Sequence, residues 1–152
     1  DGVFPASSAL IVTASMGMAV TLSPGAALLN GGYRYKNTTS LTLPVDPADG
    51  VLNRIDAVAL QWQRADRQIR AVVKKGTPAS SPAAPAITRT TDYWELYLAT
   101  ISIPAGIAAI TGAHISDKRL NIEVCGIVSS LITPDTSGWY EAWEDECKRY
   151  HW

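Results

Sequence analysis

The longest run of alternating side chains in this sequence is DYWELYLATISIP, at residues 92–104. A period of two places successive side chains on opposite faces of a β-strand. One row contains Tyr93, Glu95, Tyr97, Ala99 and Ile101, and the other contains Trp94, Leu96, Leu98 and Thr100. Because both rows carry apolar side chains, the run predicts a central strand that is covered on both faces.

Two predicted hairpins and a further strand precede this run. The sequence MAVTL at 18–22 alternates as a strand does. Residues 26–37 predict a hairpin, because Asn30, Gly31 and Gly32 tolerate the positive φ angles of a tight turn. Residues 54–63 and 68–75 predict a second hairpin around the polar turn RADR.

Strands at such short spacing, with no helical pattern between them, predict an all-β domain. We expect an antiparallel β-sandwich or flattened barrel over residues 1–132, with its strands between about Ala9 and Ile132. The chain has 152 residues and is 47% hydrophobic, which is enough to build one core.

A segment rich in Pro, Ala, Ser and Thr separates the second hairpin from the central strand. It runs from Thr77 to Ala86 and has prolines at positions 78, 82 and 85, so it cannot enter the interior of a sheet. A flexible linker between domains would favour Gly and Ser. With strand-like sequence on both sides, the segment predicts an extended loop that crosses the surface of its own domain.

The character of the sequence changes after LITPDTSG. Residues 133–152 lack strand alternation, and WYEAWEDECKRYHW is rich in good helix formers, which predicts a C-terminal helix. Its acidic residues come early and its basic residues late, in accord with the helix dipole. The seam residues, which follow the spacing of a heptad, are Tyr140, Trp143, Cys147 and Tyr150.

Two interpretations of this helix stay open: it folds back on its own domain, or it begins a stalk. In a stalk, the four seam residues face neighbouring copies. Three chains accommodate bulky seam aromatics better than two, so we expect a homotrimer or another closed oligomer. If so short a helix cannot hold the oligomer, strand faces carrying Trp62 or Tyr97 are expected to add to the interface.

Composition argues against several classes of function. Thirteen basic and 14 acidic residues give a net charge of −1, so we expect binding neither to nucleic acid nor to an anionic membrane. The apolar runs are shorter than the roughly 20 residues of a membrane helix, so we expect a soluble protein without membrane insertion. The chain begins at Asp1 without a methionine, and we expect a processed chain or a piece of a longer one.

The sequence predicts no catalytic, cofactor or metal site. No metal-ligand spacing is matched by the two cysteines and two histidines, Cys125, Cys147, His114 and His151. A single disulfide between the two cysteines remains an alternative. Acidic residues in turns or on helix faces are usually solvated, and SDKRL predicts a turn in which Asp117 caps or pairs with Arg119. The other acidic pairs considered are Asp46 with Asp49 and Glu144 with Asp145.

The five Trp and six Tyr residues suggest a carbohydrate-binding face as an alternative to packing, because aromatic rings stack on sugars. Most of them lie in strand or helix patterns, where packing is the more common role. Tyr33 and Tyr35 alternate beside a turn and are the candidates for an exposed binding pair.

The order of several segments resembles a known family. These segments are SALIVTASMGMAVTLSPGAALLNGGYRY, NRIDAVALQW, IRAVVKKGTPASSPAAPAITRT, YWELYLATISIPAGIAAITGAHISDKRLN and CGIVSSLI. Together they look like the amino-terminal module of baseplate and receptor-binding (tail-fibre-type) proteins of long-tailed phages and prophages of Gram-positive bacteria. The similarity covers nearly the whole chain, and its most specific pieces are RID, KKGTPASSP, and ISDKRL followed by CGIV.

This resemblance implies a β-rich attachment domain in the phage tail, followed by a helix and often a trimeric stalk. The expected partners are other tail or baseplate proteins, and the expected location is the virion. The alternative function is a carbohydrate-binding module that contacts cell-wall glycan on the host surface. An enzyme acting on that glycan is a distant third, so we expect no enzymatic activity.

Overall fold

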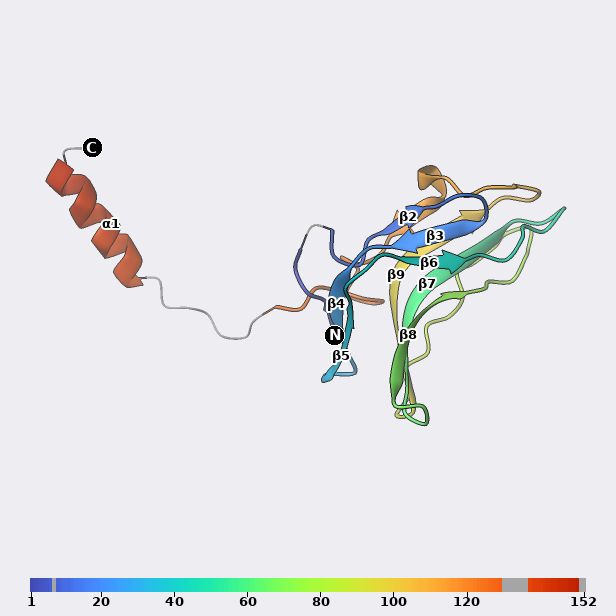
Figure 1. Cartoon of the computed structure of the whole chain (residues 1–152), viewed down its shortest axis with the longest axis horizontal. Coiled ribbons are helices and arrows are strands. Elements are labelled where there is room, and N and C mark those ends of the chain that lie inside the picture. The colour runs from blue at the N-terminus through green and yellow to red at the C-terminus, as the bar shows by residue number, and fades with distance from the viewer. Residues whose placement is uncertain (7, 130–136, 151–152) are drawn as a thin grey trace.

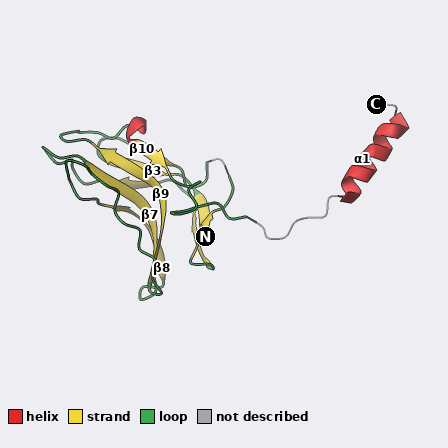
Figure 2. Ribbon diagram, turned by 180° about the vertical axis from the view of Figure 1, so that it is seen from behind, coloured by secondary structure: helices red, strands yellow, loops and turns green. Residues whose placement is uncertain are grey.

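The computed structural model describes residues 1–6, 8–129 and 137–150. Figure 1 shows a β-rich region and a C-terminal helix, and Figure 2 shows the same elements from behind. The strands are β1 (Gly2–Val3), β2 (Val12–Ala14), β3 (Ala19–Leu22), β4 (Gly25–Leu29), β5 (Tyr33–Asn37), β6 (Leu41–Pro44), β7 (Arg54–Gln63), β8 (Gln68–Lys74), β9 (Tyr93–Ile103) and β10 (Ile115–Asp117). A short 3-10 helix, η1 (Gly112–His114), precedes β10, and helix α1 covers Ser137–Tyr150.

The strands form three antiparallel sheets. The largest has the order β10-β9-β7-β8, and the smaller ones have the orders β1-β4-β5 and β2-β3-β6. The predicted all-β class with a C-terminal helix is confirmed. Of the two architectures expected, the flattened barrel is not formed by the described strands, because the two edge strands of each sheet do not pair with each other to close it.

The core lies between the largest sheet and the two smaller ones. Leu60 and Leu96 of the largest sheet are fully buried and belong to one cluster with Leu22 and Leu29 of the smaller sheets. The other face of the largest sheet carries a second cluster that includes Ala59 and Tyr97. The strand β9 therefore has apolar neighbours on both faces, as its sequence predicts, and it lies inside the sheet between β10 and β7.

A β-bulge interrupts the alternation of β9. Val58 lies opposite Ala99, but the next residue, Ala59, lies opposite Tyr97, so Leu98 is the extra residue. Leu98 and Ala99 both contact the main core, whereas Tyr97 faces the second cluster. The predicted single row from Tyr93 to Ile101 is therefore wrong beyond Tyr97, because one inserted residue reverses the phase of the side chains.

Both predicted hairpins are confirmed. Strands β4 and β5 pair through a turn in which Asn30 and Gly31 have φ angles of 49° and 70°. Strands β7 and β8 pair from Ala57 with Lys74 to Gln63 with Gln68. The turn between β7 and β8 is closed by a hydrogen bond from the Arg67 amide to the Arg64 carbonyl oxygen.

The two ends of the β-rich region lie side by side. The Val3 amide donates to the Gly126 carbonyl oxygen at 2.9 Å, and the Val128 amide donates to the Val3 carbonyl oxygen at 2.9 Å. The sheet structure thus begins at β1, ahead of the strands expected from Ala9 onward. A strand of two residues is too short to produce an alternation that sequence reading can detect.

The segment Thr77–Ala86 crosses its own domain, as expected. The Gly76 amide donates to the Asp56 carboxylate at 2.9 Å, and the Ala79 amide donates to the Asn53 carbonyl oxygen at 2.9 Å. At the other end, the Tyr97 hydroxyl donates to the carbonyl oxygens of Pro85 and Ala86, each at 3.0 Å. These contacts attach the segment to strands β7 and β9.

Helix α1 agrees in part with the predicted charge order. Its last turn contains Lys148 and Arg149, but its first turn contains no acidic residue, because the helix begins at Ser137 and the acidic residues start at Glu141. Residues 130–136 and 151–152 of the predicted connection and helix lie outside the described residues. No helix in the described part of the chain is long and apolar enough to span a membrane.

Candidate functional site

A groove lies between the edge strand β5 and the hairpin β7–β8, both of which can be located in Figure 1. It has a volume of about 630 Å³. The residues that line it are Tyr33, Arg34, Tyr35, Lys36, Trp62, Arg64, Arg67, Gln68 and Ile69. A groove of this size falls within the usual range for small-ligand sites, about 300–1,000 Å³.

A stacked pair of aromatic rings forms one side of the groove. The centroids of Tyr33 and Trp62 are 4.5 Å apart, and their planes differ by 27°. Trp62 is only 4% exposed, whereas Tyr33 is 47% exposed. The buried indole thus supports the exposed phenol ring from behind, which fixes the orientation of Tyr33.

The two tyrosines predicted as an exposed pair differ in their surroundings. Tyr33 is exposed as expected, but Tyr35 is half-buried and packs against the main core. Burial raises the pKa of the Tyr35 hydroxyl. The structure therefore provides Trp62, and not Tyr35, as the ring in contact with Tyr33.

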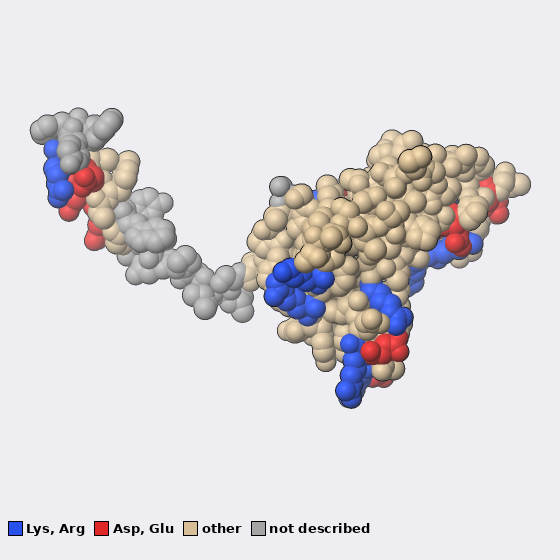
Figure 3. Space-filling model, in the orientation of Figure 1, with Lys and Arg blue, Asp and Glu red and all other residues tan. Residues whose placement is uncertain are grey.

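Four of the residues that line the groove are basic, and none is acidic. Arg34 and Lys36 come from β5, and Arg64 and Arg67 come from the turn between β7 and β8. Figure 3 shows basic groups on the part of this face that the two hairpins form. Sequence reasoning missed these residues, because they lie about 30 positions apart and neither hairpin alone forms a basic run.

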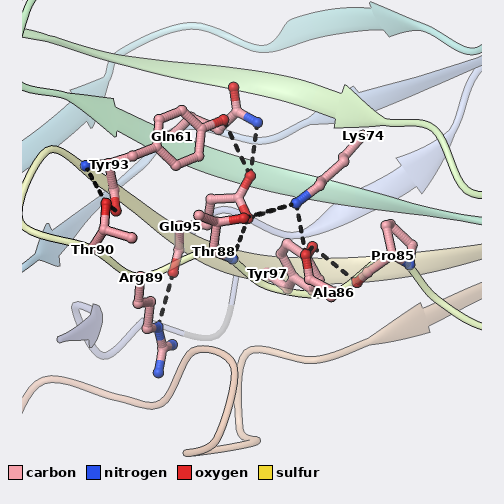
Figure 4. A network of polar contacts seen from close by, with 10 residues as sticks. All are labelled: Gln61, Lys74, Pro85, Ala86, Thr88, Arg89, Thr90, Tyr93, Glu95 and Tyr97. Carbon is pink, nitrogen blue, oxygen red and sulfur yellow. Dashed lines mark hydrogen bonds and ion pairs between the residues drawn. The ribbon is translucent and has the colours of Figure 1, made fainter.

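A network of polar groups lies under the loop that precedes β9 (Figure 4). The Glu95 carboxylate is fully buried and accepts hydrogen bonds from the Thr88 amide at 2.7 Å and from the Gln61 side chain at 2.9 Å. Lys74 donates to the same carboxylate at 2.9 Å and to the Ala86 carbonyl oxygen at 2.7 Å. This network joins β7, β8 and β9 to the loop.

The charge of Lys74 is stabilised within this network. Burial favours the neutral amine, but the hydrogen bonds with Glu95 and Tyr97 and their charges outweigh it, and the pKa of Lys74 is raised above its ordinary value. Because every oxygen of Glu95 has a partner and the carboxylate does not line the groove, the arrangement has a structural role in this fold.

The acidic residues considered as catalytic candidates have local partners. Asp49 accepts hydrogen bonds from the Leu52 and Val51 amides, and these bonds lower the pKa of its carboxyl. Asp46 pairs with Lys75 at 3.1 Å. Asp46 and Asp49 both lie in the connection between β6 and β7.

The predicted turn at Asp117 is confirmed. The Arg119 amide donates to the Asp117 carboxylate at 2.9 Å, and the Arg119 guanidinium pairs with it at 2.6 Å. The hydrogen bonds from the Arg119 side chain are the main reason that the pKa of Asp117 is lowered. Arg119 also donates to the Ala9 carbonyl oxygen at 2.7 Å, so this turn joins the two ends of the domain.

Cys125 and Cys147 are both free thiols. Cys125 is buried in the main core, and burial raises its pKa to about 11. Cys147 lies on α1. Within the described residues, no group of three His, Cys, Asp or Glu side chains is placed to hold a metal ion.

The seam of helix α1 is described only in part. Trp143 is 66% exposed, and Cys147 is partly exposed. The side chains of Tyr140 and Tyr150 lie outside the described part of the chain. Trp62 and Tyr97, which were expected to supply further interface, are 4% and 3% exposed, so this expectation is wrong because both rings are packed inside their own domain.

A second groove, of about 340 Å³, lies where the two ends of the β-rich region meet. Its lining is mostly apolar and includes Val3, Phe4, Leu120 and Ile127. Leu120 is 76% exposed and Ile127 is 46% exposed. Leu120 and Ile127 thus add accessible apolar surface to this groove.

Comparison of the chain with protein-family models, with curated proteins and with solved structures found no match.

Proposed function

We propose that this chain is a structural attachment module of a phage tail, which docks to other tail or baseplate proteins and leads through its helix to a distal host-binding part. Under this proposal the protein is a homotrimer in the virion and has no enzymatic role. The assignment is supported by the order of its sequence segments, which resembles that of such modules. A β-rich domain whose two core clusters contain no described side chain of helix α1 also supports it.

The observation that carries the proposal is the exposure of Trp143. A helix of 14 residues is marginal by itself, and burial of Trp143, which is 66% exposed, against a partner would stabilise it. Among the side chains of α1 that the structure describes, none belongs to either core cluster. In the proposed oligomer, a neighbouring copy of the helix supplies the surface that covers Trp143. Three copies also present several receptor-binding parts at once.

The exposed apolar residues around the second groove support protein docking by the β-rich domain itself. Leu120, Ile122 and Ile127 are all exposed and close in sequence. Clustered apolar side chains at a protein surface are typical of contacts with other proteins. A neighbouring tail protein is the partner that the proposal requires.

Sedimentation velocity of the chain at tens of micromolar tests the trimer. We expect a species of three times the chain mass, which Trp143→Ala shifts to monomer by weakening association about tenfold or more. Asp145→Ala is the matched control, because Asp145 lies on the same helix but about opposite the seam. A monomeric parent chain, or an oligomer that is unaffected by Trp143→Ala, would remove α1 from the assembly.

The groove between β5 and β7–β8 favours a second candidate function, saccharide binding. Tyr33 presents an exposed ring that Trp62 holds in place, with polar and charged side chains around it. This combination is typical of a surface on which a sugar ring stacks and forms hydrogen bonds at its edge. In this role the domain contacts host cell-wall glycan directly, while α1 keeps its part in assembly.

A further inference from the structure

The charge of the groove differs from that of the whole chain. The chain has 13 basic and 14 acidic residues, but the groove is lined by four basic residues and no acidic residue. A concave surface with one sign of charge concentrates ligands of the opposite sign. The local field therefore favours an anionic ligand, although the net charge of the protein does not.

Three of the four cations have no counter-ion. Arg34, Lys36 and Arg67 form no ion pair with any of the residues that the structure describes. Arg64 pairs with Asp92 at 3.5 Å, and both side chains are more than two-thirds exposed, so this pair is weak. At least two donors are thus available to an anion without breaking a buried contact.

The backbone that carries these cations is ordered on both sides of the groove. Arg67 has a φ angle of 50°, and its amide closes the turn between β7 and β8. On the other side of the groove, the Arg34 guanidinium lies 5.7 Å from the centre of the Phe4 ring. Lys36 follows on β5, one residue before Asn37, whose side chain accepts a hydrogen bond from the Gly25 amide at 2.8 Å.

We infer that this groove binds an acidic saccharide, with a sugar ring stacked on Tyr33 and its anionic group held by Lys36 and Arg67. The exposed face of Tyr33 is supported by Trp62 and suits the C–H face of a pyranose. The cations suit a carboxylate of a uronic acid or a phosphate ester on the sugar. This inference rests on saccharide binding, the second candidate function, and adds the charge of the ligand.

An acidic peptide fits the groove less well. Peptides that bind in grooves are anchored by apolar side chains in pockets or by strand pairing along an edge. Although β5 is an edge strand, main-chain pairing with it would use neither the stacked ring nor the cations. The apolar side chains of this groove are the stacked pair, the half-buried Tyr35 and Ile69, and they form a supported ring surface without a separate pocket. A ring-shaped ligand with an anionic substituent uses both the ring surface and the cations.

Titration calorimetry with a galacturonic acid tetramer tests the inference. The neutral galactose tetramer, a phosphorylated galactose oligomer and a glutamate tetrapeptide are the comparison ligands. We expect the galacturonate or the phosphorylated oligomer to bind at least about tenfold more tightly than the neutral tetramer, which corresponds to one well-placed charged hydrogen bond. Binding of either acidic ligand supports the inference, and their relative affinity identifies the anionic group.

Three variants locate the binding site. Tyr33→Ala removes the ring surface, and the double variant Lys36→Gln/Arg67→Gln removes the two cations assigned to the anionic group; each is expected to weaken binding about tenfold or more. Arg70→Gln is the control, because Arg70 lies on the same hairpin, pairs with Asp66 at 3.4 Å and does not line the groove. It is expected to change affinity less than about twofold. Lys36 and Arg67 are exposed, so the double variant keeps the fold even if Tyr33→Ala does not.

Each remaining result overturns a defined part of the inference. Equal affinity for the neutral tetramer would exclude the acidic preference and leave saccharide binding in place. Equal affinity for the glutamate peptide would mean that the groove selects charge without recognising a sugar. Absence of binding to every saccharide, or binding that none of the groove variants changes, would exclude the groove as a saccharide site. None of these results bears on association through α1.

Discussion

At the level of single residues, Glu95 is the side chain whose role the sequence conceals most completely. The alternating pattern correctly places it on the same face as Tyr97, but it says nothing of its partners. Gln61, Lys74 and Thr88 come from β7, β8 and the loop before β9, so the site exists only after three segments meet. A carboxylate in an otherwise apolar strand is the one local signal that such a network is needed.

Removing this carboxylate should strongly destabilise the fold. Glu95→Ala leaves the Thr88 amide, the Gln61 side chain and the Lys74 ammonium without their acceptor, and we expect a loss of about 3 kcal/mol in the free energy of unfolding. Asp92→Ala is the matched control, because its pair with Arg64 is exposed and is expected to contribute less than about 0.5 kcal/mol. Urea denaturation measures both, and similar losses for the two variants would contradict a special role of the buried pair.

The same network gives stability a defined dependence on pH. The pKa of Lys74 is raised on folding, so its contribution is fully present below the unfolded pKa, near 10.5, and is lost as pH rises through the folded pKa. In Glu95→Ala this alkaline loss should be smaller, because the partner that raises the pKa is absent. The comparison needs only denaturation curves at several pH values above 9.

At the level of elements, the sequence predicts hairpins well and irregularities poorly. The turn at Asn30 and Gly31 is encoded by adjacent residues, so the β4–β5 hairpin follows from local sequence. The bulge at Leu98 is different, because it is defined by the register between β9 and β7. The side chains on either side of the bulge alternate normally, and nothing local marks the reversal of phase.

The loop Thr77–Ala86 offers a test at this scale. Tyr97→Phe removes the hydroxyl that donates to Pro85 and Ala86 but keeps the ring in its cluster. We expect a cost of about 1 kcal/mol and faster protease cleavage within the loop. Tyr33→Phe is the control, because the Tyr33 hydroxyl has no hydrogen-bond partner among the described residues. Equal cleavage of the parent chain and Tyr97→Phe would mean that these bonds do not hold the loop.

At the scale of the whole molecule, the candidate groove shows what sequence reading can and cannot find. Tyr33 was predicted as exposed from its place beside a turn. Trp62 was assigned to packing, which is correct, but its contact with Tyr33 depends on how the β4–β5 hairpin meets the largest sheet. The basic lining also depends on the fold, because Lys36 and Arg67 are distant in sequence and come to the same groove only when the two hairpins meet.

The relation between α1 and the β-rich domain leads to the last prediction. A chain that ends at residue 132 lacks α1 but keeps every residue of both core clusters. At a dilution where the full chain is monomeric, we expect the two chains to have melting temperatures within about 2 °C of each other, because none of the helix side chains that the structure describes belongs to the core. Leu98→Ala in the full chain is the positive control: it removes a side chain that is 1% exposed and should cost about 2–5 kcal/mol. At higher concentration, only the full chain should self-associate. A large loss of stability on truncation would instead show that α1 folds back on its own domain, and the seam would then be covered within one chain.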